Sequence, residues 1–171
     1  MTAAPAISLA VAVEAGEWGD AGAIEALAQA ALEVAVRDLA EREAQPFPED
    51  PPEVSLVLAD DAMMADINGQ WRAQPKPTNV LSFPAFPLVP GGRPGPMLGD
   101  IILARETIER EAEDLGKPVE HHITHLIVHG FLHLFGYDHI ANNDAEKMEA
   151  IETRILASLD LSDPYGDTEP V

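Results

Sequence analysis

Three histidines in the C-terminal half of the chain have the spacing of a metal site. His129 and His133 are four residues apart, so on a helix both imidazoles lie on one face and can reach the same ion. Gly136 stands where a helix commonly ends in a left-handed residue, and the chain can then turn back and bring His139 toward the pair. Three neutral imidazoles leave the ion its charge and an open position, which lowers the pKa of a bound water toward about 7. The pattern therefore predicts a catalytic metal site.

The helix expected at residues 119–135 is apolar around nearly its whole circumference. Its polar side chains fall mainly in one stripe, formed by His125, His129 and His133. A helix of this kind is buried, and a buried imidazole is costly without a polar partner. His129 or His133 taken alone can be an ordinary hydrogen-bonded core residue, but the pair together with Gly136 and His139 is better explained by a metal ion.

The other polar residues of this region have two interpretations each. His125 is expected either as a ligand or as a partner of a ligand, and packing alone would also account for it. Asp138 could orient an imidazole through its second nitrogen or simply form a turn. His121 and His122 stand near the helix start, where we expect exposure to solvent. Gly130 occupies the position at which zinc peptidases with the H-E-x-x-H motif carry their general base, which disfavours peptide hydrolysis.

The elements that must position these residues follow from the hydrophobic pattern. Apolar or alternating runs predict strands at 7–13, 53–59, 79–83 and 99–104. Helical spacing and capping residues predict helices at 21–43, from 60 or 61 to about 71, at 105–115, at 119–135 and at 143–159. The long Pro- and Gly-rich loop at 84–96 is expected to be functional or mobile, or else a flexible hairpin without a task.

The composition predicts one globular domain. The chain has 171 residues, of which 46% are hydrophobic and 23% charged. We expect a single domain over residues 1–160, with an acidic, flexible tail at 161–171. The absence of cysteine excludes disulfides, iron–sulfur clusters and thiolate zinc sites. Any metal must therefore be held by His, Asp or Glu.

The net charge of −20 argues against nonspecific binding of nucleic acid, because that affinity comes mainly from neutralising phosphates. The apolar run at 3–13 lacks the basic residues of a signal peptide and is too short to span a bilayer. We interpret it as a strand that opens a cytoplasmic protein without membrane contact.

The run from His129 to His139, HGFLHLFGYDH, closely resembles the H-G-x-L-H-L-x-G-Y-D-H signature of the YbeY family, bacterial rRNA maturation factors described as metal-dependent endoribonucleases. Residues 68–72 with 77–84 resemble the second block of the family, and residues 98–101 resemble its third. Met148 and Glu152 also fit. The resemblance covers residues 54–156.

This resemblance implies a zincin-like α+β fold in which a small mixed β-sheet of about four strands packs with helices and the metal site lies on a buried helix. It implies one Zn²⁺ per chain, held by His129, His133 and His139, and Arg72 as a functional residue of the cleft. It also implies action on the 3′ end of 16S rRNA in the small subunit and in ribosome quality control, with ribosomal RNA and the ribosome as partners.

The segment from Trp71 to Ala104 differs in charge from the rest of the chain. Its only acid is Asp100, whereas three basic residues give it a local balance of +2: Arg72, Lys76 and Arg93. A locally positive cleft can accept a strand that the acidic remainder would repel, although these side chains could also merely be solvated. Arg72 is the best candidate for binding phosphate, because a guanidinium can bind two nonbridging oxygens. We expect strand or turn roles for Thr78 and Ser82, with donation to substrate as the alternative.

The leading hypothesis is a single-strand-specific, zinc-dependent endoribonuclease with Arg72 and His129 as catalytic residues. A second hypothesis is a ribosome-biogenesis factor that acts mainly by binding and whose zinc is structural. A third is a metal-dependent hydrolase of a small molecule or peptide.

Overall fold

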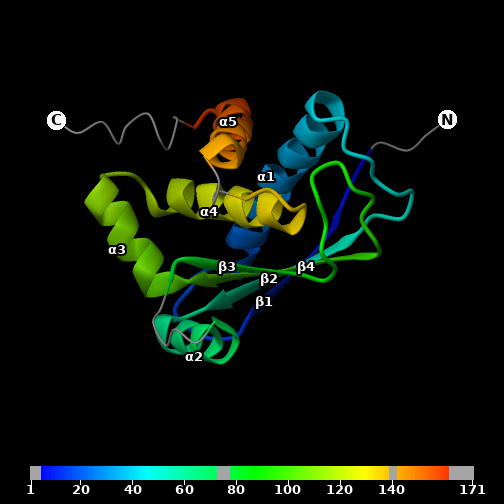
Figure 1. The fold of residues 1–171 in the computed structure, drawn as a ribbon. Coiled ribbons are helices and arrows are strands. Elements are labelled where there is room, and N and C mark those ends of the chain that lie inside the picture. Colours follow the sequence, from blue (N-terminus) through cyan, green and yellow to red (C-terminus); the bar gives the residue numbers. More distant parts are fainter. Residues whose placement is uncertain (1–4, 73–77, 139–141, 162–171) are drawn as a thin grey trace.

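The computed structural model describes residues 5–72, 78–138 and 142–161, without the side chains of Trp71, Arg72 and Asn142 (Figure 1). The strands are β1 (Ser8–Val13), β2 (Glu53–Ala59), β3 (Val80–Pro84) and β4 (Met97–Ala104). The helices are α1 (Ala21–Arg42), α2 (Asp61–Arg72), α3 (Arg105–Leu115), α4 (Val119–Leu134) and α5 (Asn142–Ser158). Each predicted strand and helix is therefore present, and their ends differ from the expected ones by a few residues at most.

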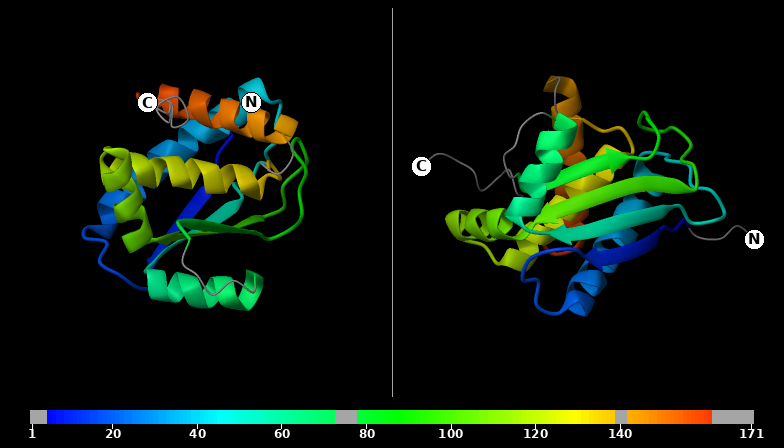
Figure 2. Two further views of the ribbon diagram at one scale, coloured as in Figure 1. Left: turned by 60° about the vertical axis from the view of Figure 1, so that its left-hand side comes forward. Right: turned by 90° about the horizontal axis from the view of Figure 1, so that it is seen from below.

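The four strands form one mixed sheet in the order β1-β2-β4-β3. β1, β2 and β4 run parallel, and β3 pairs antiparallel with β4. Helices α1, α4 and α5 lie on one side of this sheet and α2 lies on the other (Figures 1 and 2). This arrangement confirms the predicted α+β fold with a small mixed sheet. It also makes β3 one edge of the sheet, on the side where α4 packs.

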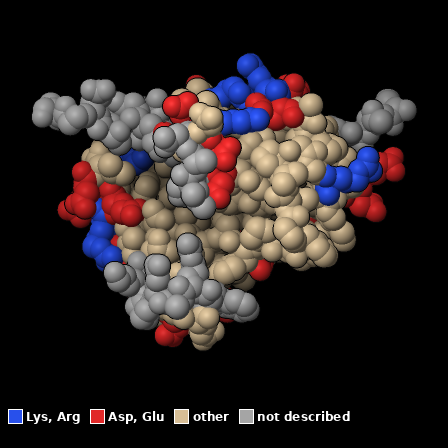
Figure 3. All heavy atoms as spheres, in the orientation of Figure 1, with Lys and Arg blue, Asp and Glu red and all other residues tan. Residues whose placement is uncertain are grey.

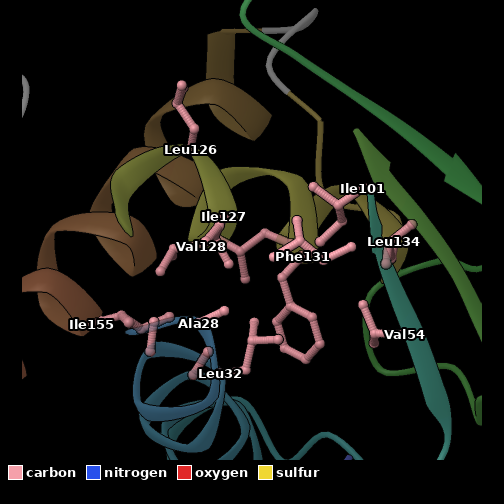
Figure 4. Close-up of a cluster of buried hydrophobic side chains, with 14 of the residues drawn as sticks. Ala28, Leu32, Val54, Ile101, Leu126, Ile127, Val128, Phe131, Leu134 and Ile155 are labelled. Atoms are coloured by element: carbon pink, nitrogen blue, oxygen red, sulfur yellow. The ribbon is translucent and has the colours of Figure 1, made fainter. Parts of the chain in front are cut away.

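The main hydrophobic core lies between the sheet and the helices on the α4 side. The side chain of Phe131 is fully buried there, close to Leu32 of α1 and Val54 of β2 (Figure 4). A smaller cluster fills the α2 side and consists of Ala59, Met64, Leu81, Ile102 and Ala104. Burial extends around most of α4, as its apolar circumference predicts, so the polar atoms on this helix must find partners inside the protein.

The loop between β3 and β4 is tied to the body of the protein by one buried amide. Gln45, only 3% exposed, donates from Nε2 to the carbonyl of Gly92 at 2.7 Å and accepts from the N–H of Gly91 at 3.1 Å. Leu88 of the same loop packs against the main core. These contacts argue against the expectation that this loop is a flexible hairpin.

Helix α5 is fixed to α1 by a partly buried ion-pair network. The Nε of Arg154 donates to Oδ2 of Asp38 at 2.7 Å, and its Nη2 donates to Oε2 of Glu43 at 3.1 Å. The two carboxylates raise the pKa of the guanidinium, which stays charged. Together with the buried Met148 and Ile151, this network sets the position of α5 over α4.

Among the described residues, no helix is both long and apolar enough to cross a bilayer.

Candidate metal centre

The histidine stripe of α4 faces a buried carboxylate from α5. Oε2 of Glu152 lies 2.7 Å from Nε2 of His125, and Oε1 lies 2.9 Å from Nδ1 of His129. The Glu152 side chain has no exposed surface. Burial alone would raise the pKa of this carboxyl, but the hydrogen bonds from the two imidazoles outweigh burial and lower the pKa to about 2. Glu152 is therefore ionised and accepts both hydrogen bonds.

The contact with Glu152 fixes which nitrogen of His129 is available. A carboxylate can only accept, so Nδ1 of His129 carries its proton, and in the neutral ring the lone pair is at Nε2. That Nε2 atom lies 3.1 Å from Nε2 of His133, one turn further along α4. Two nitrogens that each lie about 2.0–2.1 Å from one zinc ion are at most about 4.2 Å apart. The spacing of these two nitrogens is thus compatible with one shared ion.

A pocket of about 670 Å³ opens in front of these two imidazoles. One wall is formed by residues 78–84, and the other by His129, His133 and Asp138. Apart from Asp138, no charged side chain is among the described residues that line it. Figure 3 shows a broad uncharged area on the face of the molecule where β3 and α4 lie in front. A site here is open to a substrate, as a catalytic ion requires.

Gly130 sets the distance between α4 and the edge of the sheet. A Cβ built on Gly130 would lie 3.0 Å from Cγ2 of Ile101 and 3.0 Å from Oγ of Ser82. The Ser82 hydroxyl donates to the Gly130 carbonyl at 3.1 Å. The glycine thus lets the helix approach the strand closely, and this approach places the imidazoles of the adjacent turns beside β3. In the sequence Gly130 stands where a zinc peptidase has its base, and in the structure it has a packing role.

His129 belongs to two different sets of possible metal ligands. Ligand atoms of His125, His129 and Glu152 lie within 4.8 Å of one another and could hold an ion. However, neither His125 nor Glu152 lines the pocket, and both Glu152 oxygens already accept hydrogen bonds. We therefore favour the set that uses Nε2 of His129 and His133, with Glu152 orienting the His129 ring from behind, as carboxylates commonly do in zinc sites.

The turn after α4 depends on Gly136. Its φ is +95°, and a Cβ there would lie 2.2 Å from the carbonyl oxygen of Leu88. The N–H of Tyr137 bonds to the carbonyl of Leu132 at 3.2 Å, which closes the helix. This confirms the left-handed residue predicted at Gly136 and directs the chain along the pocket toward Asp138.

Gly136→Ala is expected to destabilise the protein by about 2–3 kcal/mol, because it combines backbone strain with a clash against a main-chain atom. The matched control is Gly116→Ala, where φ is +68° but no atom lies within 4 Å of the added Cβ. Gly116→Ala has the backbone strain without the clash, so its loss of stability should be clearly smaller. Urea denaturation of both variants measures the difference, and equal losses would contradict the role given to the contact with Leu88.

The expectation that His122 is exposed is wrong. His121 is exposed as predicted, but His122 is only 4% exposed, and its Nε2 lies 2.7 Å from Oε1 of Glu111 on α3. Burial lowers the pKa of His122, although the hydrogen bond with Glu111 opposes the shift. The helix start is covered because α3 packs against α4, and this contact is not visible in the local sequence. Glu111 also accepts from Nδ2 of Asn79 at 3.0 Å.

The other predicted site residues are placed only in part. Arg72 is the last residue of α2, and its side chain is not described. His139 and Lys76 lie outside the described residues. Asp138 lines the pocket with His129 and His133. The metal set of His129, His133 and His139 and the catalytic roles of Arg72 and His129 therefore remain predictions.

From the sequence, Glu152 is only a residue that fits a family pattern. In the structure it is the shared partner of His125 and His129. One signal could have found it: an acid between the apolar Met148 and Ile155 on the inward face of α5, where a charge needs a partner.

The chain is similar to known proteins over nearly its whole length. The family model described as "Endoribonuclease YbeY" matches residues 18–160. A curated relative with that name from Sinorhizobium fredii is 60% identical, and the match covers 95% of this chain and 94% of the relative. Another from Rhizobium meliloti is 56% identical, and the match covers 96% of this chain and 98% of the relative. A solution structure of a Thermotoga maritima protein shares the fold, with a TM-score of 0.53 and 22% identity over 91% of this chain and 99% of that one. The chain belongs to the endoribonuclease YbeY family.

Proposed function

We propose that this protein is a metal-dependent endoribonuclease that cuts single-stranded RNA. Membership of the endoribonuclease YbeY family supports a role in cutting RNA. Metal dependence is proposed because the Nε2 atoms of His129 and His133 lie 3.1 Å apart at the wall of an open pocket. His139 would complete the set with a third imidazole. The proposed ion is zinc, one per chain, which imidazole ligands suit.

The residues of the chain have separate tasks in this proposal. A zinc ion bound there would supply Lewis-acid chemistry to a phosphodiester. Glu152 holds the Nδ1 proton of His129 and keeps the Nε2 lone pair directed at the pocket. Arg72 is proposed to bind the nonbridging oxygens of the phosphate and to stabilise the charge that develops on them.

The proposed substrate in the cell is the 3′ end of 16S rRNA, with the small ribosomal subunit as partner, in rRNA maturation and ribosome quality control in the cytoplasm. The resemblance described above motivates this assignment. The strongly acidic surface supports selectivity, because a net charge of −20 repels RNA that does not enter the site.

Cleavage of a labelled single-stranded RNA, its duplex and the same sequence as DNA tests the proposal. We expect internal cuts in the single-stranded RNA only. Arg72→Ala should lower kcat/KM about 100-fold, and Arg72→Lys should restore only part of it, because an ammonium does not bind two oxygens in the same plane. Arg42→Ala, at the exposed end of α1, is the control and should leave cleavage unchanged.

The cellular assignment is tested by deleting the gene and following the 3′ end of 16S rRNA. Precursor should accumulate, and the wild-type gene but not the Arg72→Ala gene should remove it. If Arg72→Ala restores maturation, the protein acts by binding and the nuclease proposal fails. Full activity of Arg72→Ala on RNA in solution would contradict the phosphate-binding role.

A further inference from the structure

The outer edge of β3 forms a wall of the pocket. β3 is the last strand of the sheet, and within the described part of the chain only β4 pairs with it. Every residue from 78 to 84 lines the pocket. These residues include some whose side chains point toward α4 and others whose side chains point toward α2. Such a lining is expected only where a pocket runs along the free edge of a strand. Backbone groups of β3 are thus part of the pocket surface.

The pairing with β4 determines which backbone groups face outward. The carbonyl of Asn79 accepts from the N–H of Ala104 at 3.1 Å, and the N–H of Ala85 donates to the carbonyl of Leu98 at 2.9 Å. In an antiparallel pair the residues alternate between those that bond to the partner and those that do not. Odd-numbered residues of β3 therefore face β4. The even-numbered ones present their N–H and C=O groups to the pocket.

As far as the described residues show, only one of the three outward residues keeps an available N–H. The N–H of Val80 donates to Oδ1 of Asn79 at 2.7 Å, and Pro84 has no N–H. Ser82 remains, with both an N–H and a C=O on the outer edge. Its hydroxyl is turned inward to the carbonyl of Gly130. The chemistry that Ser82 presents to the pocket is thus one backbone donor beside one backbone acceptor.

This pair suits the sugar–phosphate chain of RNA better than a peptide. A peptide that extended the sheet would need repeated donors along the edge, but Val80 and Pro84 supply none. In RNA, a phosphate oxygen accepts, and the neighbouring ribose 2′-hydroxyl can donate. DNA lacks the second group. One donor and one acceptor side by side therefore match one nucleotide unit of RNA.

We propose that Ser82 holds the substrate through its backbone, its N–H donating to a phosphate oxygen and its C=O accepting from a ribose 2′-hydroxyl. This inference rests on the proposed function, and it names the contact by which the site would distinguish RNA from DNA. Ser82 binds and positions the strand beside His129 and His133, and it takes no part in bond breaking.

Pulsed hydrogen–deuterium exchange, resolved to single residues and made within seconds of mixing, tests the N–H directly. In the wild-type protein without RNA, the N–H of Ser82 should exchange quickly and those of Leu81 and Phe83 slowly. Adding a short single-stranded RNA should slow exchange at Ser82 at least tenfold and leave Leu81 and Phe83 unchanged. No variant is needed, so this measurement does not depend on folding of a mutant.

Two variants and one substrate change separate the two contacts. Ser82→Pro removes the outward N–H without removing a bond to β4, and it should raise the Kd for a fluorescent single-stranded RNA about tenfold, measured by anisotropy extrapolated to the time of mixing. Ser82→Ala lacks the same hydroxyl but keeps the N–H, so its Kd should be about tenfold lower than that of Ser82→Pro. A single 2′-deoxy substitution at one position of the RNA should weaken binding to the wild type about tenfold. Circular dichroism verifies that both variants are folded.

The outcomes distinguish this inference from the proposed function. If the protein cuts RNA but Ser82 exchange does not change and 2′-deoxy substitution has no effect on binding, the inference is overturned and the nuclease remains. If metal-loaded protein neither binds nor cuts RNA, both fail. If peptides rather than RNA slow exchange at Ser82, the edge is a peptide site and the inference is wrong.

Discussion

Replacing His129 by alanine is expected to remove the metal and the cleavage of RNA together. His129 is the residue that joins the two halves of the site, because its Nδ1 contacts Glu152 and its Nε2 faces Nε2 of His133. Wild-type protein purified without added metal or a polyhistidine tag should contain about one zinc per chain, and the variant should contain none. The loss in kcat/KM should be on the order of a thousandfold or more, equivalent to about 4 kcal/mol of transition-state stabilisation.

Elemental analysis and cleavage of single-stranded RNA measure the two losses in the same preparations. His121→Ala is the matched control, since His121 is an exposed histidine at the start of the same helix, and both properties should be unchanged. Zinc retained in His129→Ala would show that the ion is held elsewhere. No metal in either protein would make the stripe a buried polar network and favour a ribosome factor that acts by binding.

Replacing Glu152 by alanine is expected to cause the largest loss of stability, about 3–5 kcal/mol. The side chain is fully buried and accepts from two imidazoles, so its removal leaves the N–H groups of His125 and His129 that face it without their buried acceptor. Glu152→Gln keeps the shape but can accept from one ring only, so a smaller loss is expected. Urea denaturation of the metal-free proteins gives both values without a contribution from bound zinc.

The same variants test whether Glu152 acts on the metal through His129. Glu152→Gln should weaken zinc binding about 10–100-fold, as found for carboxylates that orient zinc-binding histidines, measured by competition with a chelator. Glu146→Ala, on the exposed face of α5, is the control and should change stability by less than about 0.5 kcal/mol. A Glu152→Ala protein as stable as the wild type would refute the buried-carboxylate interpretation.

Local signals were sufficient to predict the elements of this fold. Asp20 caps α1 by accepting from the N–H of Gly22 at 2.9 Å, and Gly116 ends α3 in the left-handed conformation, as their types suggest. β4 begins two residues earlier than predicted, at Met97. Gly99, with φ at +144°, interrupts the apolar pattern there and hides the true start of the strand.

Contacts between distant segments were harder to predict. The burial of His122 depends on Glu111 of α3, and the order of the loop after β3 depends on Gln45, far back in the chain. The role of Glu152 depends on how α5 crosses α4, which is set partly by Arg154 and Asp38. None of these partners has a fixed sequence spacing from the residue it contacts. Spacing on one helix predicted the histidine pair, but it could not predict what lies opposite.

The position of Glu152 on the last described helix has a consequence for synthesis of the chain. A ribosome releases β3 and α4 before α5, because a protein is made from its N-terminus. Until α5 emerges and docks, the imidazoles of His125 and His129 have no carboxylate to orient them, even if the sheet and α4 are already in place. The nascent chain therefore carries the histidines before it has an ordered site, and the arrangement described here arises only after α5 has been made.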